Sequence, residues 1–76
     1  MPRRYSSREL TRLAESQGWR FSRQRGSHMI FVKWRERNHV SIPASEREVR
    51  VGTVANIKRQ MRLSNEEFNR IVDEVL

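Results

Sequence analysis

The chain has no cysteine, only three glycines and two prolines, and no long apolar run. Without cysteine, neither a disulfide framework nor a thiolate metal site can form. Its two histidines lack the clustered partners of a zinc site, so we expect no metal and no cofactor. The longest apolar run, Met29 to Val32, is too short for a signal peptide or a membrane span. We therefore expect a cytoplasmic protein without membrane association.

Negative charge is also scarce. Lysine and arginine total 16 residues against nine aspartates and glutamates, which gives a net charge of +7. Arginine far outnumbers lysine, and its guanidinium group can bind two phosphate oxygens at once, whereas an ammonium group acts as a point charge. This bias favours a nucleic-acid partner. The alternative is a solvated basic surface that maintains solubility.

The length limits the architecture to one domain over residues 1–76 with a thin core. Hydrophobic residues make up 36% of the chain, which is enough to cover one sheet face with helices. A large enclosed substrate cavity is not expected. We therefore expect the substrate to bind on an open surface of the protein.

Capping signals predict three helices. Ser6 and Ser64 are each followed three residues later by a glutamate, which is the spacing of a capping box. Gly18 is predicted to end the first helix in a left-handed conformation. Gly52-Thr53 is predicted to open a middle helix. Each segment has apolar residues at helical spacing, so each should cover the core with one face.

Strand signals lie between the first two helices. Alternation of apolar and polar residues predicts strands at 19–24, 28–34 and 39–42, joined by a turn at Arg25-Gly26-Ser27 and a polar turn at 35–38. Pro43 closes the third strand. The predicted fold is α+β, in the order α-β-β-β-α-α, with a three-stranded antiparallel sheet covered by helices on one face. The predicted buried face consists of Trp19, Phe21, Met29, Phe31, Val40 and Ile42. His28 and Ile30 then belong to the open face. Because Ile30, Val32 and Trp34 are also apolar, a shift of one residue would exchange the two faces.

Several motifs occur together in a fixed order. Residues 23–28 read RQRGSH, Val40-Ser41-Ile42-Pro43 follows, and Gly52-Thr53-Val54 opens the middle helix. This arrangement resembles the HicA-type toxins of bacterial toxin–antitoxin systems. The resemblance implies a double-stranded-RNA-binding-domain-like fold, a type II toxin that cleaves mRNA, and neutralisation by a HicB-like antitoxin. The chain departs from the family pattern at Met29, where many members have a second histidine, and at Ala44, where many have a polar residue.

In that family the histidine of the Gly-Ser-His motif is the catalytic residue, and here that position is His28. A neutral imidazole can take the proton of an RNA 2′-hydroxyl, and the activated oxygen can attack the adjacent phosphate without a metal ion. A single histidine does not also supply the general acid; His39, water or a basic side chain are the alternatives. The candidate RNA-binding residues are Arg23, Arg25, Ser27, Lys33, Arg35, Lys58 and Arg59.

Plainer explanations exist for these residues. Arg20 and the other arginines near the hairpin can equally form a solvated sheet edge that resists aggregation. Trp34 can stack on a base, but its place in the predicted strand favours burial in the core. Two rival functions fit the same fold: a non-catalytic RNA-binding module, and a degenerate toxin kept for binding a protein partner.

Overall fold

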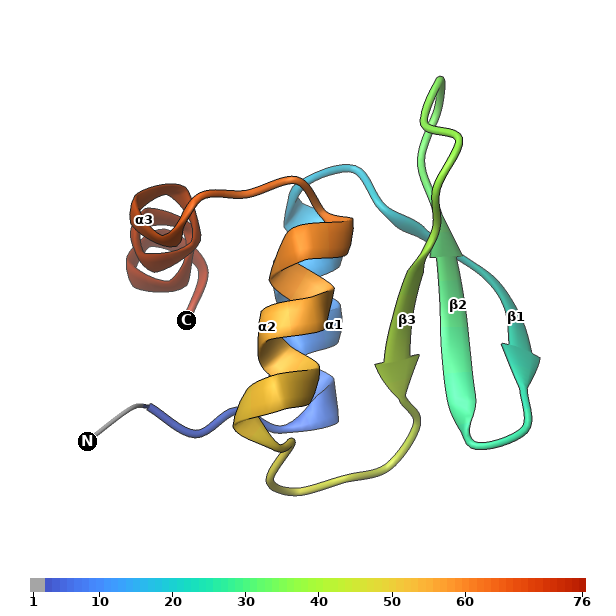
Figure 1. The fold of residues 1–76 in the computed structure, drawn as a ribbon, viewed down its shortest axis with the longest axis horizontal. Coiled ribbons are helices and arrows are strands. Elements are labelled where there is room, and N and C mark those ends of the chain that lie inside the picture. Colours follow the sequence, from blue (N-terminus) through green and yellow to red (C-terminus); the bar gives the residue numbers. More distant parts are fainter. Residues whose placement is uncertain (1–2) are drawn as a thin grey trace.

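The structure is a computed structural model that describes residues 3–76. Its elements are α1 (Ser7–Ser16), β1 (Arg20–Arg25), β2 (His28–Val32), β3 (Val40–Pro43), α2 (Val51–Gln60) and α3 (Asn65–Val75). The predicted α+β class and α-β-β-β-α-α order are confirmed. Figure 1 shows the sheet as one layer, α1 and α2 together as a second, and α3 beyond them. The helices therefore leave one face of the sheet open.

Both capping boxes form as predicted. The Ser6 hydroxyl accepts a hydrogen bond from the Glu9 amide at 3.1 Å, and the Glu9 carboxylate accepts one from the Ser6 amide at 3.0 Å. Ser64 and Glu67 repeat this arrangement at the start of α3. Hydrogen bonds from the Ser64 backbone amide, and then from its hydroxyl, lower the pKa of the Glu67 carboxyl. Gly18 follows α1 with φ of +90°, in the left-handed region that was predicted.

The middle helix begins one residue before the predicted Gly52-Thr53 opening, at Val51, and no side chain caps it. Its Ile57 is buried against the sheet layer, and α1 and α2 both contact β3. The outer helix α3 contacts α1. Tyr5, just before α1, lies edge-on to Phe68 of α3 with ring centroids 5.6 Å apart, and this contact ties the outer helix to the body of the protein.

The core follows most of the predicted buried face of the sheet. Trp19, Phe31, Val40 and Ile42 are buried, and Met29 is half-buried against them. Phe21 was predicted to be buried, and that prediction is wrong, because its side chain is 54% exposed. β1 is an edge strand, whereas α1 and α2 cover the opposite edge at β3. The Phe21 ring consequently packs edge-on to Phe31 at 5.9 Å and otherwise faces solvent.

Trp34 was predicted to extend the second strand into the core, which is also wrong. The strand ends at Val32, and the Glu36 amide donates to the Lys33 carbonyl at 3.0 Å to close a turn. Arg35 takes the third position of this turn with φ of +65°. The turn carries Trp34 away from the sheet and leaves it 85% exposed.

Candidate functional site

The β1–β2 turn is held by hydrogen bonds on both sides. Gly26 has φ of +62°, and nothing lies within 4 Å of the position that a Cβ would take, so the backbone conformation alone calls for glycine. The Gln24 side chain donates to the Gly26 carbonyl at 3.0 Å. The Ala44 amide donates to the Ser27 carbonyl at 2.8 Å and joins the turn to the end of β3. The residue that follows the turn therefore has a fixed position.

That residue is His28, the first residue of the central strand. It lies opposite Arg25 on β1 and opposite the buried Pro43 on β3. Its imidazole is exposed, on the face that the helices leave open, as predicted. The Ser27 hydroxyl oxygen lies 3.5 Å from Nδ1, at the outer limit of a hydrogen bond. The ring is thus accessible to a ligand and only loosely oriented by its neighbour.

A β-bulge brings two arginines to the same face as His28. Continued alternation after Phe21 would point Arg23 and Arg25 toward the helices. The register instead shifts between Phe21 and Arg23, so that Arg23 lies opposite Ile30 and Arg25 opposite His28. Residues directly opposite each other on neighbouring strands share a face. The bulge therefore places Arg23 and Arg25 on the same sheet face as His28, which the sequence pattern did not show.

Ile30 lies on this open face, as predicted, yet only 4% of it is exposed. It occupies the central strand, between Arg23 on β1 and Ser41 on β3. The surface next to His28 therefore combines one buried apolar residue with a basic and a polar partner on the neighbouring strands. Such a surface suits the backbone of a polyanion.

Two of the other predicted RNA-binding residues contact side chains away from His28. Lys33 follows Val32 and turns toward the helix side, where its ammonium group lies 5.8 Å from the centroid of the Trp19 ring. Lys58 donates a hydrogen bond to Asn65 and lies 5.4 Å from the centroid of the Phe68 ring. Both lysines are half-buried, and neither joins the surface around His28.

Arg35 and Arg59 are also apart from His28. Arg35 is exposed in the turn after β2, at the far end of that strand. Arg59 is exposed on α2, where it donates to the Asn56 side chain at 2.7 Å. Of the predicted set, the structure therefore brings together Arg23, Arg25, Ser27 and His28.

His39 does not complete a pair with His28. It precedes Val40, which lies opposite Phe31, whereas His28 lies opposite Pro43 at the other end of β3. At about 3.3 Å per strand residue, more than about 10 Å of strand separates the two histidines. His39 is exposed and is too distant to act on the same phosphate as His28.

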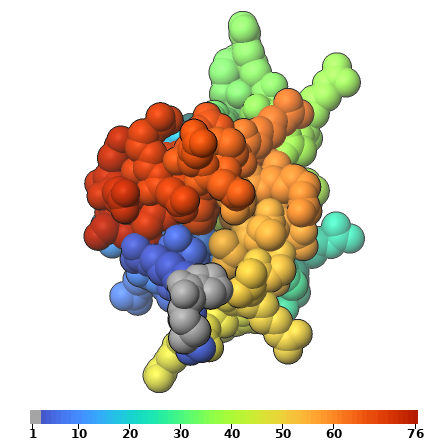
Figure 2. Space-filling model, turned by 60° about the vertical axis from the view of Figure 1, so that its left-hand side comes forward, coloured from blue at the N-terminus to red at the C-terminus, as the bar shows by residue number. Residues whose placement is uncertain are grey.

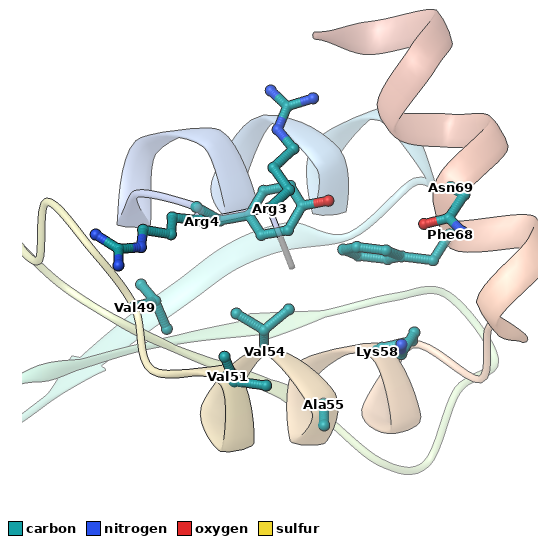
Figure 3. Close-up of a pocket in the computed structure, with 10 residues that line it drawn as sticks. Arg3, Arg4, Val49, Val51, Val54, Ala55, Lys58, Phe68 and Asn69 are labelled. Carbon is teal, nitrogen blue, oxygen red and sulfur yellow. The ribbon is translucent and has the colours of Figure 1, made fainter. Parts of the chain in front are cut away.

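A hollow of about 260 Å³ lies elsewhere, between the N-terminal segment, α2 and α3 (Figure 3). Val49, Val54 and Phe68 contribute apolar surface to it, and Arg3 and Arg4 lie at the segment that crosses it. Neither histidine lines this hollow. Tyr5 and Lys58 also line this hollow, which is an apolar recess with a basic rim.

Two further features of residues 3–76 bear on the candidate site. Within this range no group of three or more histidine, cysteine, aspartate or glutamate side chains is placed to hold a metal ion. No helix in the same range is long and apolar enough to cross a membrane.

Comparison with known proteins gives a family assignment. A search of curated proteins found no match. The family model described as "HicA toxin of bacterial toxin-antitoxin" matches residues 7–63, which include α1, the whole sheet and α2. This match contains the hairpin turn, His28 and the bulged arginines, and it ends before α3. The chain therefore belongs to the HicA toxin family of bacterial toxin–antitoxin systems.

Proposed function

We propose that this toxin is an mRNA-cleaving endoribonuclease with His28 as its catalytic residue, acting in the cytoplasm and restrained by a HicB-like antitoxin. One observation carries the proposal: His28 is exposed on the open face of the sheet, opposite Arg25 and next to the Arg23–Ile30 pair. An extended RNA backbone can cross this face without entering a cavity. The two guanidinium groups would hold its phosphates beside the imidazole.

The chemistry follows from these groups. His28 takes the proton of a ribose 2′-hydroxyl, and the resulting oxygen attacks the adjacent phosphorus. The bond to the 5′-oxygen of the next nucleotide breaks, and that oxygen takes a proton from the solvent that reaches the open face. Arg23 and Arg25 stabilise the negative charge that builds on the phosphate oxygens. The products are a 2′,3′-cyclic phosphate and a 5′-hydroxyl, and no step calls for a metal ion.

The purified protein should cleave single-stranded RNA at an unchanged rate in the presence of a chelator, because the substrate supplies its own nucleophile. The measurement is the rate of cleavage of a labelled RNA together with the chemistry of both new ends. Cyclic phosphate and 5′-hydroxyl ends are expected. New 5′-phosphate ends, or loss of activity with chelator, would contradict the mechanism. Binding without any cleavage would instead support the non-catalytic RNA-binding module.

Replacing Arg23 and Arg25 together by glutamine should weaken RNA binding and also make it less dependent on salt. Each phosphate contact to a single strand contributes a slope of about −0.7 in log affinity against log salt, through counterion release. The double variant should therefore lose on the order of one unit of slope. Arg70→Gln is the matched control, since Arg70 is exposed on the outer helix α3. Equal slopes for the double variant and the control would show that RNA does not cross this face.

A further inference from the structure

Aromatic and basic side chains gather at the end of the β1–β2 hairpin opposite to His28. Four large apolar side chains stand out as exposed among residues 3–76, and three of them line one shallow hollow there: Phe21, Val32 and Trp34. The charged residues that line the same hollow are all basic: Arg20, Arg35, and Lys33, whose ammonium group lies over the Trp19 ring. We call these six residues the Trp34 subsite.

The Trp34 side chain does not contribute to the hydrophobic core. Its side chain is 85% exposed, whereas the other tryptophan, Trp19, is 2% exposed. The hydrogen-bonded turn from Lys33 to Glu36 holds Trp34 outside the sheet. Figure 2 shows the segment around residues 33–39 projecting from the rounded body of the protein. A large flat apolar side chain presented in this way is available to a ligand.

The chemistry of the hollow fits one ligand class in particular. A nucleobase offers a flat π-face to an indole ring, and the phosphates on either side of it require cations. The hollow supplies both, and its lining contains no acidic side chain among the described residues. The net charge of +7 attracts a polyanion in addition. We infer that the Trp34 subsite binds single-stranded RNA, with one base stacked on the Trp34 indole and the flanking phosphates held by Arg20 and Arg35.

The Trp34 subsite and His28 lie at opposite ends of the same hairpin face. Arg20 lies opposite Val32, on the same sheet face as the pairs Arg23–Ile30 and Arg25–His28. Val32 and His28 end and begin β2, so about 13 Å separates them, and Trp34 lies beyond Val32. A row of arginines on β1 thus connects the two ends of the hairpin. One RNA strand would follow this row, with a base at Trp34 and the cleaved phosphate at His28.

This inference rests on the proposed function and narrows its substrate. In a duplex the bases are stacked on each other and paired, so an indole at the surface cannot reach a base face. Stacking on Trp34 therefore selects an unpaired strand. Stacking on Trp34 also sets a minimum length for the RNA substrate, because a dinucleotide held at His28 does not extend to Trp34.

Tryptophan fluorescence tests the subsite directly. The titration uses His28→Ala protein, which cannot consume the RNA, and a single-stranded hexanucleotide of mixed sequence. Because Trp19 is buried, a change in the accessible emission reports on Trp34. We expect saturable quenching, binding about tenfold weaker in Trp34→Ala and nearly normal binding in Trp34→Phe. Val51→Ala is the matched control, since Val51 is exposed on α2, and the matched duplex should quench weakly.

These experiments distinguish a failure of the Trp34 subsite from a failure of the cleavage mechanism at His28. With otherwise wild-type protein, Trp34→Ala should slow cleavage of the hexanucleotide but not of a dinucleotide. Tight RNA binding without quenching, and with no effect of Trp34→Ala, overturns the subsite and leaves cleavage at His28 standing. Normal RNA binding by Trp34→Ala with lost binding of a co-expressed antitoxin also overturns it and assigns the hollow to a protein partner. Absence of both RNA binding and cleavage in the wild type overturns the subsite and the proposed function together.

Discussion

Replacing His28 by alanine should abolish RNA cleavage and, in a bacterial host, growth arrest upon induction. A positioned general base contributes about 10²–10⁴-fold to a rate, so the residual cleavage should fall by at least about a hundredfold. RNA binding should change little, because Arg23 and Arg25 remain on the open face. The measurements are the cleavage rate of a labelled RNA, the level of intact mRNA in induced cells, and the growth curve.

The fold should tolerate this substitution, which makes the result interpretable. His28 is exposed, and surface substitutions usually change the free energy of unfolding by less than about 0.5 kcal/mol. Its weak contact to Ser27 at 3.5 Å contributes little. His39→Ala is the matched control, since His39 is also an exposed histidine but lies at the other end of β3. A His28→Ala protein with normal circular dichroism, normal melting and undiminished cleavage would remove His28 from the mechanism.

Local signals in the sequence were sufficient for the helices and for most of the core. The two capping boxes involve residues three positions apart, and the glycines after α1 and between β1 and β2 act on their own backbone. Such signals depend little on the rest of the fold. The central strand is also predictable from its apolar run, and Phe31 is buried as predicted.

The errors concern features that depend on distant parts of the chain. The exposure of Phe21 follows from the position of α1 and α2 over the opposite edge of the sheet, which no local pattern encodes. The bulge after Phe21 is a property of two paired strands, and it decides which face Arg23 and Arg25 share. Trp34 continued the apolar pattern of β2, but the turn at Arg35 takes it out of the strand.

The candidate site was therefore only partly predictable. The motif around His28 could be read from the sequence. Its open-face position depended on which face of the continuously apolar stretch 29–32 is buried, and the pairing of the strands decides that. The sequence identified the neighbouring arginines as candidates, but it did not show on which face of the sheet they lie. Lys33 and Lys58 illustrate the limit, because the contacts of their ammonium groups with the Trp19 and Phe68 rings become visible only once distant segments are packed.

Replacing the ribose by deoxyribose at a single cleaved position should block cleavage there and leave neighbouring sites intact. In the proposed mechanism the 2′-hydroxyl is the nucleophile, and His28 only removes its proton. Loss of that oxygen leaves His28 with nothing to activate, however well the strand is bound. Affinity should change little, because Arg23 and Arg25 contact phosphates, which the substitution preserves.

The measurement compares matched oligonucleotides, with and without the one 2′-hydroxyl, under chelating conditions. Each is incubated with wild-type protein and, for affinity, with His28→Ala protein. We expect cleavage at the deoxy position to fall below detection while both oligonucleotides bind alike. A 2′-O-methyl ribose at the same position should block cleavage as well, since its oxygen has no proton to give. Cutting of the deoxy position at the normal rate would instead require a water nucleophile, and His28 would then activate that water across the open face of the sheet.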